Sequence, residues 1–308
     1  MSILDTIGRT RLVPLRRMVP EGHARVLLKL ELENPTGSMK DRMALAMVEA
    51  AEQDGRLRPG ACVVEYTGGS TGVSLAFVCS VKEIPLKIVT SEVFSQEKRD
   101  HMAAFGAELT LVGEAGGGTT KGLTEEMIAT AKALAEETPG SVWTDQLNNT
   151  DQVACYDALG RELVEQTSGE IDAFVQSVGT SGSFRGISTH LRAQVPGVRT
   201  VAVEPAESAV LSGGPTGSHK IEGTGAGFVV PLWQPELASE IQTVSTEEAM
   251  ATARELARRE GIFAGTSTGG NVAVALRLAE ELGPDRTIVT LAVDSGMKYL
   301  STPLYAGA

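Results

Sequence analysis

Short β-rich runs alternate with segments of helical periodicity along most of this chain. The β-rich runs lie at 26–32, 62–65, 86–90, 108–112, 173–176, 200–203 and 287–291. The helical segments lie at 41–54, 71–82, 95–105, 124–136 and 246–260, and a glycine run at 116–118 precedes the fourth of them. This alternation predicts an α/β protein with mainly parallel sheets and helices on both sheet faces.

Size and charge narrow the classes of function. The chain has 308 residues, enough for one large domain or two of moderate size, and the segments 138–141 and 145–152 are the best candidates for a crossing between domains. Its 39 acidic against 27 basic residues give a net charge of -12, which argues against nucleic acid or an anionic membrane as a partner. The N-terminus lacks a basic stretch followed by an apolar core, so we expect a cytoplasmic protein.

The cysteines and histidines are too scattered to predict a disulfide or a metal site. Cys62, Cys79 and Cys155 stand among apolar residues, with no Cys-x-x-Cys pair. The four histidines show no spacing typical of a metal centre or of a catalytic pairing. We therefore expect buried free thiols in a reducing compartment and no bound metal.

The segment NPTGSMKDR at 34–42 places Lys40 between a β-rich run and a helical segment. Asn-Pro ends the strand, so Lys40 is expected at or just before a helix N-terminus. The helix dipole disfavours a cation there by about 0.3–1 kcal/mol, which lowers a lysine pKa by well under one unit. Position alone favours an incidental surface lysine, whereas burial or a covalent cofactor would make the amine reactive.

Three segments share a turn of small hydroxyl residues and glycines between a predicted strand and a predicted helix. They are EYTGGSTG at 65–72, VGTSGSFRG at 178–186 and AGTSTGGN at 264–271. Glycines let backbone N–H groups approach an anion, and a helix N-terminus favours negative charge. Such turns also serve merely to join elements. Three together predict sites for at least two anionic groups, such as a phosphate and a carboxylate, while the nucleotide signatures G-x-G-x-x-G and Gly-Lys-[Ser/Thr] are missing.

Longer motifs resemble the cysteine synthase and cystathionine β-synthase family, the fold-type-II pyridoxal-phosphate enzymes that include O-acetylserine sulfhydrylases. IGRTRLV at 7–13 is similar to IGNTPLV, and 34–42 to NPxGSVKDR. VEP at 203–205, HKIEGTGAGF at 219–228 and DSGMKYLST at 294–302 are similar to VEP, HKIQGIGAGF and DSGERYLST. The similarity runs nearly end to end.

The resemblance implies a fold and an assembly. It implies two doubly wound domains with mainly parallel sheets, as in the tryptophan synthase β-like fold. Residues 1–11 and 36–145 would form a smaller, mobile domain that carries the substrate loop. Residues 12–35 and 146–308 would form a larger domain that binds the cofactor phosphate. A homodimer acting on small molecules is also implied.

The resemblance also implies roles for single residues. Lys40 would form the internal aldimine with pyridoxal 5'-phosphate and act as the base on the substrate Cα proton. Ser267 would face the pyridine nitrogen, and Ser70 would contact the cofactor ring. The cofactor phosphate would be cradled by Gly179, Thr180, Ser181, Gly182 and Ser183. The substrate would be bound by Thr67, Gly68, Gly69, Thr71, Gln146 and Gly225.

The substrate loops depart from the family pattern while the cofactor motifs hold. Where the family has Thr-Ser-Gly-Asn-Thr-Gly, this chain has Gly68 in place of serine and Ser70 in place of asparagine. The stretch after Gln146 also lacks the family's Asn-Pro-Ala-Asn. Two interpretations stay open: the same chemistry with a different amino acid or nucleophile, or drift within ordinary cysteine synthases.

The implied activity is β-replacement on an activated L-serine-type amino acid, such as O-acetylserine. Sulfide or another small nucleophile would add to an aminoacrylate and give cysteine or an analogue. A β-eliminating lyase, either a cysteine desulfhydrase or a serine/threonine dehydratase, is the first alternative. A non-catalytic relative that binds a ligand or a partner protein is the second, and the retention of Lys40, the phosphate loop and Ser267 argues against it.

Overall fold

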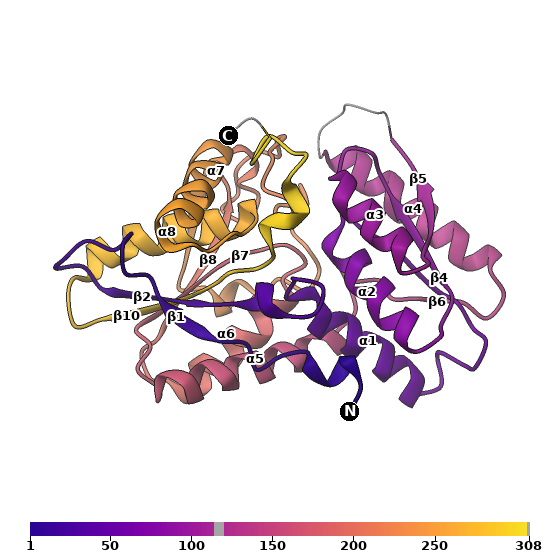
Figure 1. The fold of residues 1–308 in the computed structure, drawn as a ribbon, viewed down its shortest axis with the longest axis horizontal. Coiled ribbons are helices and arrows are strands. Elements are labelled where there is room, and N and C mark those ends of the chain that lie inside the picture. The colour runs from indigo at the N-terminus through magenta and orange to yellow at the C-terminus, as the bar shows by residue number, and fades with distance from the viewer. Residues whose placement is uncertain (114–119, 307–308) are drawn as a thin grey trace.

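The computed structural model describes residues 1–113 and 120–306, and it contains two β-sheets. Figure 1 shows one sheet and its helices on each side of the molecule, joined at the centre by the chain around α1. The glycine run at 116–118 lies outside the described residues. The α/β class and the mainly parallel sheets are confirmed.

The larger sheet has six strands in the order β1-β2-β10-β7-β8-β9. All neighbours are parallel except β1 and β2. The strands are β1 (Leu12–Pro14), β2 (Arg25–Lys29), β7 (Ala173–Ser177), β8 (Arg199–Pro205), β9 (Glu240–Val244) and β10 (Thr287–Leu291).

Helices cover both faces of this sheet because successive side chains of its strands point to opposite faces. Phe174 packs with α5 (Asp151–Thr167) and α6 (Gly182–Gln194) on one face. Val175 packs with α7 (Thr246–Glu255) and α8 (Thr266–Leu282) on the other. Strands buried on both faces explain the continuous apolar runs in the sequence.

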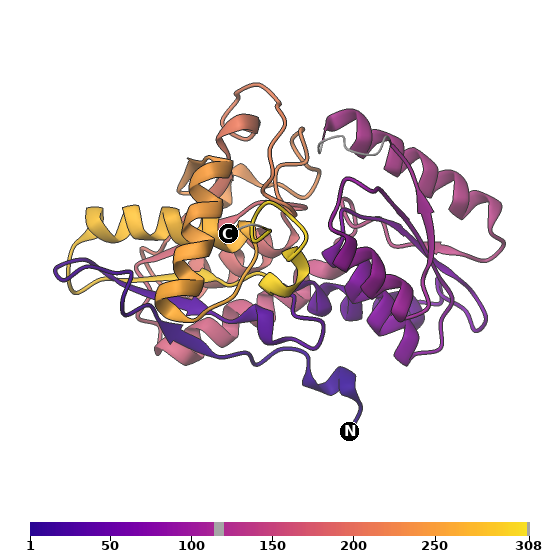
Figure 2. The same cartoon turned by 45° about the horizontal axis from the view of Figure 1, so that its top comes forward.

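The smaller sheet has four parallel strands in the order β5-β4-β3-β6. They are β3 (Val63–Tyr66), β4 (Leu86–Thr90), β5 (Glu108–Leu111) and β6 (Val142–Trp143). α1 (Lys40–Gln53), α2 (Ser70–Val81) and α3 (Gln96–Ala104) lie on one side, and α4 (Lys121–Glu137) covers the other. Figure 2 shows α4 on the opposite side of the smaller sheet from the other three helices.

Several element ends differ from the predictions. The strand expected at 26–32 ends at Lys29, and a 3-10 turn, Glu31–Glu33, follows, because buried Glu31 is held by Arg42. The helix expected at 246–260 changes at Leu256 to a π-helical turn. The third glycine loop does not follow a strand, since Ala264 makes only an isolated bridge to Ser295.

The chain crosses between the two sheets in the region where the sequence suggested a boundary. β6 is the last strand of the smaller sheet, and α5, which begins at Asp151, packs on the helices of the larger one. The strands of the smaller sheet fall within 36–145, and those of the larger sheet within 12–35 and 146–308. One apolar cluster runs through both halves, and therefore the two-domain division stays a prediction.

Candidate active site

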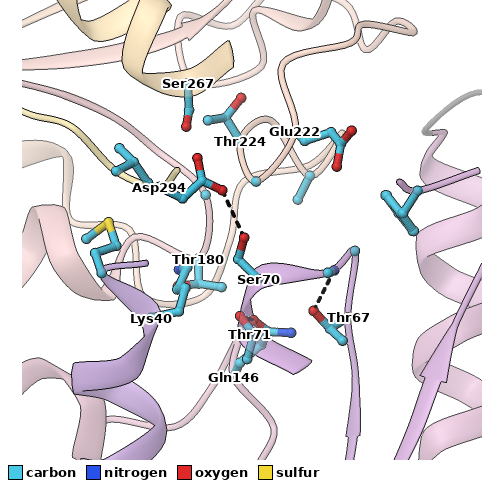
Figure 3. Close-up of a pocket in the computed structure, with 18 of the residues that line it drawn as sticks. Lys40, Thr67, Ser70, Thr71, Gln146, Thr180, Glu222, Thr224, Ser267 and Asp294 are labelled. Carbon is cyan, nitrogen blue, oxygen red and sulfur yellow. Dashed lines mark hydrogen bonds between the residues drawn. The ribbon is translucent and has the colours of Figure 1, made fainter. Parts of the chain in front are cut away.

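A pocket lies between the two halves of the molecule. All three glycine loops contribute to its wall, and two of them leave the carboxyl ends of β3 and β7. Ligand sites of open α/β sheets lie at such strand ends. Figure 3 shows Lys40, Thr67, Thr180 and Ser267, from four separate segments, around one cavity. The structure thus brings together the segments that the sequence analysis singled out.

Lys40 is the first residue of α1 and lines this pocket, half-buried. The turn before it is held by Asp41, whose carboxylate accepts hydrogen bonds from the Thr36 N–H at 2.8 Å and from the Ser74 hydroxyl at 2.6 Å. Burial lowers the pKa of Lys40 to about 8, against an opposing effect of Cys155 and Asp294. The incidental surface lysine is therefore excluded, because desolvation makes the amine more readily neutral.

The loop before α6 has the shape of an anion cradle. Gly179, Thr180 and Ser183 line the pocket, while Ser181 and Gly182 are buried and are not among its described lining residues. Ser181 adopts a φ of 71°, which turns the backbone into the helix N-terminus. A Cβ on Gly179 would lie 2.2 Å from the carbonyl oxygen of Gly223, so only glycine fits there. The first N–H groups of α6 have no partner within the helix and are free for a ligand.

The loop before α2 lines another part of the pocket wall with Thr67, Gly68, Gly69, Ser70 and Thr71. The Thr71 hydroxyl donates to Gln146 Oε1 at 2.8 Å, and Gln146 Nε2 donates to the Tyr66 carbonyl at 2.7 Å. The Thr67 hydroxyl accepts the Gly69 N–H at 2.9 Å. These bonds fix the loop, and the first backbone N–H groups of α2 have no partner within the helix and can bind an anion.

Ser70 and Gly68 explain how the chain accommodates its departures from the family pattern. The Ser70 hydroxyl donates to Asp294 Oδ2 at 3.0 Å, as the dashed line in Figure 3 shows. The same oxygen accepts the Tyr299 hydroxyl at 2.7 Å. A Cβ on Gly68 would lie 2.9 Å from the ring of Phe94. Glycine at this position therefore makes room for an aromatic side chain in the pocket wall.

Gly225 is placed differently from the other predicted residues. It is not among the described residues that line the pocket, although Thr224 and Ala226 are. Its N–H donates to the Val178 carbonyl at 3.1 Å, and its φ is 59°. A Cβ there would lie 2.8 Å from His219 Nε2. In this structure Gly225 therefore bonds to Val178, at the start of the second glycine loop.

Sequence reasoning missed several residues of the pocket wall: Phe94, Lys98, Glu222, Asp294 and Tyr299. Asp294 and Tyr299 belong to the segment DSGMKYLST, and Glu222 to HKIEGTGAGF, so motif position could have indicated them. Lys98 gives no such signal. It reaches the pocket because α3 packs beside the α2 loop.

The residues present fit pyridoxal phosphate. The Ser181 hydroxyl is buried beside the cradle without a hydrogen-bond partner among the described residues, as expected where a ligand oxygen would complete the site. Ser267, in the first turn of α8, lines the pocket with a neutral hydroxyl. Together with the amine of Lys40, these groups match the phosphate, ring nitrogen and aldehyde of the cofactor.

Comparisons with known proteins agree with this geometry. A cysteine synthase of Staphylococcus aureus is 42% identical over 307 residues, which are 99% of this chain and 97% of the relative. The crystal structure of an O-ureido-L-serine synthase superposes with a TM-score of 0.94 at 36% identity and covers 100% of this chain and 95% of that one.

A hydrogen sulfide-producing enzyme from Fusobacterium nucleatum gives a TM-score of 0.92 at 34% identity, over 97% of this chain and 99% of that one. These similarities confirm the fold-type-II architecture that the sequence predicted. Residues 3–294 match the profile of the family described as pyridoxal-phosphate dependent enzymes. The chain belongs to the pyridoxal-phosphate dependent enzyme family, within its cysteine synthase branch.

Proposed function

We propose that the enzyme catalyses β-replacement on an activated L-serine-type amino acid, with sulfide or another small nucleophile, to give cysteine or an analogue. The observation that carries this proposal is the position of Lys40, which has a pKa of about 8 and lines one pocket with all three glycine loops. The cysteine synthase relative at 42% identity supports sulfide as the nucleophile.

Pyridoxal phosphate, when bound, supplies an electron sink that makes the Cα proton acidic and lets a β-substituent leave. Lys40 would hold the cofactor and move the proton at the substrate Cα. Its lowered pKa suits this role, because a base works best when its pKa lies near the working pH. The neighbouring Asp294 and Ser70 lie in the same pocket wall and keep the lysine in a polar setting.

The remaining residues bind and orient. The loop from Gly179 to Ser183, with the N-terminus of α6, would hold the phosphate. Ser267 would meet the ring nitrogen, and its neutral hydroxyl leaves a weaker electron sink, which suits loss of a β-substituent. The α2 N-terminus would bind the substrate carboxylate, with Gln146 and Thr71 holding the loop in place.

The test measures products from O-acetylserine with and without sulfide. Replacement predicts cysteine when sulfide is present and little pyruvate in either case. Equal pyruvate in both cases would instead establish the β-eliminating alternative, which the similarity to a hydrogen sulfide-producing enzyme makes the natural competitor. Lys40→Ala should abolish both products, and the visible absorption band of the bound cofactor should shift or disappear in that variant. If the purified protein has no such band, the proposal fails.

Location and assembly follow as further proposals. We propose a cytoplasmic homodimer with a mobile smaller domain formed by 1–11 and 36–145. Cys62, Cys79 and Cys155 are free thiols, which supports a reducing compartment. No helix among the described residues combines the length and the apolar character needed to cross a bilayer. Sedimentation of the purified enzyme tests the dimer.

A further inference from the structure

An ion pair joins the two halves of the molecule at the pocket. Lys98 comes from α3, beside the smaller sheet, and Glu222 from the loop that follows β8. Lys98 Nζ lies 2.6 Å from Glu222 Oε2, and both residues line the pocket. Lys98 is only 2% exposed. The pair is therefore part of the wall that a substrate meets and is largely removed from bulk water.

The position of Lys98 is tightly constrained. Its stem packs against Gly69, where a Cβ would lie 2.2 Å from Lys98 Cδ. Its ammonium stands 4.1 Å from the centroid of the Tyr299 ring, a favourable cation–π position. Tyr299 in turn donates to Asp294. The ammonium is thus fixed next to the predicted substrate loop.

Paired charges dominate the pocket. The charged groups among its described lining residues are Lys40, Lys98, Glu222 and Asp294. Lys40 would hold the cofactor. Asp294 Oδ2 accepts hydrogen bonds from Ser70 and Tyr299, while Asp294 Oδ1 has no partner among the described residues. The carboxylate of Glu222 forms an ion pair with the ammonium of Lys98. Among the described lining residues, no cation is then left for a second negative group on the substrate.

We propose that the Lys98–Glu222 pair determines leaving-group specificity by selecting an uncharged β-substituent, such as an acetyl ester, over an anionic one, such as a phosphate ester. This inference rests on the proposed function. In both reactions the Cβ–O bond breaks, the oxygen leaves with the electron pair as acetate or inorganic phosphate, and Lys40 takes the Cα proton. The carboxylate of Glu222 offsets the charge of Lys98, so a phosphate ester at this wall meets a second anion and no net positive charge, whereas an acetyl ester has no negative charge to repel.

Charge-altering variants test the pair. Glu222→Gln frees Lys98, and we expect the ratio of kcat/KM for O-phosphoserine to that for O-acetylserine to rise about tenfold, the worth of one charge-assisted contact. The glutamine restores the residue of the family motif HKIQGIGAGF at this position. Lys98→Gln leaves Glu222 unpaired and should lower the ratio below that of the wild type. In the double variant, the ratio should lie within about threefold of the wild-type ratio, because both charges are gone.

A binding measurement on the holoenzyme separates this inference from the proposed function. Calorimetric titration with inorganic phosphate should show about tenfold tighter binding to Glu222→Gln than to the wild type, and no gain in the double variant. If phosphate affinity shifts but neither ester reacts, the proposed function fails and the charge selection stands. If O-acetylserine reacts normally while both the ratio and the phosphate affinity stay unchanged in Glu222→Gln, the inference is overturned.

The matched control is Glu52→Gln. Glu52 pairs with Lys82 at 2.7 Å on the outer surface, so the variant makes the same change in charge away from the pocket. It should leave both the substrate ratio and the phosphate affinity at wild-type values. A comparable shift in this control would show that net charge alone is responsible and would also overturn the inference.

Discussion

Phe94 explains the least expected residue of the substrate loop, Gly68. Gly68 lies where the family pattern has serine, and a Cβ there would be 2.9 Å from Phe94 Cε1 and 3.1 Å from Cζ. Both residues line the pocket. The missing hydroxyl at position 68 therefore leaves room for the ring of Phe94. Gly68 and Phe94 should behave as one unit in substrate selection.

A double-mutant cycle tests this coupling. Gly68→Ser should lower kcat/KM about tenfold, because the serine cannot enter without displacing the Phe94 ring or the loop. Adding Phe94→Ala to Gly68→Ser should recover most of the lost kcat/KM. The Phe94→Ala single variant measures the effect of removing the ring alone. Steady-state kinetics of all four proteins give the coupling. Additive effects of the two changes would contradict the steric explanation.

At the level of elements, the helix that carries Lys40 is anchored by a buried ion network. Arg42 of α1 bonds Glu31 at 2.7 Å and Glu162 of α5 at 2.6 Å. Lys29 of β2 bonds Glu162 at 2.6 Å. The network joins a strand of the larger sheet to α1 and α5, and its Arg42 stands two residues after Lys40, the proposed catalytic lysine. It holds the start of α1 in place against the pocket.

Glu162 makes this anchor sensitive to acid. Burial alone raises its pKa, but the hydrogen bonds and charges of Arg42 and Lys29 outweigh burial and lower the pKa to about 2. Because the folded pKa lies below the ordinary value, Glu162 contributes its full stability above about pH 4.5 and loses it as the pH falls toward 2.

Glu162→Gln should reduce the free energy of unfolding at pH 7 by on the order of 3 kcal/mol, since it leaves Lys29 and Arg42 short of a buried partner. Below pH 4.5, the free energy of unfolding of this variant should decrease less with falling pH than that of the wild type. Urea titrations at pH 7 and pH 3.5 measure both effects. Glu165→Gln, at an exposed position of the same helix, is the control and should match the wild type. Equal stability of the two variants would rule out the anchor.

At the scale of the whole molecule, the cofactor would lie at the junction of the two halves. The pocket is lined by segments from both, and the Lys98–Glu222 pair crosses it. The Ser301 N–H also donates to Glu97 of α3 at 2.6 Å, and this bond is a further link between the halves. A ligand bound there contacts both sides and stabilises their arrangement, since only the folded chain can bind it.

Removal of pyridoxal phosphate should therefore lower the Tm. Re-adding it at 100 times its Kd should restore about 2.7 kcal/mol of stability. Gly179→Ala should show little of this recovery, because its Cβ would lie 2.2 Å from the Gly223 carbonyl oxygen and disturb the phosphate cradle. Thermal melts of the cofactor-free and reconstituted proteins measure this. Full recovery in Gly179→Ala would show that the loop does not hold the phosphate.

Much of the fold could be predicted because its signals are local. The strand at 287–291 is observed at those residues, and the helix expected from 41 begins at Lys40. The ends of strands were harder to predict. The strand that ends at Lys29 is an example, because the buried ion pair that follows it joins Glu31 to Arg42, eleven residues later in the chain. β6, two residues long, and β9 also lacked a clear local pattern, since their pairing partners lie far along the chain.

The sequence alone determined the alternating α/β plan, the position of Lys40 at a helix start and the three glycine-rich turns that we propose bind anions, because glycine, proline and apolar spacing act over a few residues. Tertiary structure alone decided that Lys40 is desolvated, that Ser70 bonds Asp294 and that Gly68 faces Phe94. It also decided that Lys98 meets Glu222, 124 positions later in the chain. Burial and pairing of charges depend on which distant segments share a pocket, and no local pattern records that.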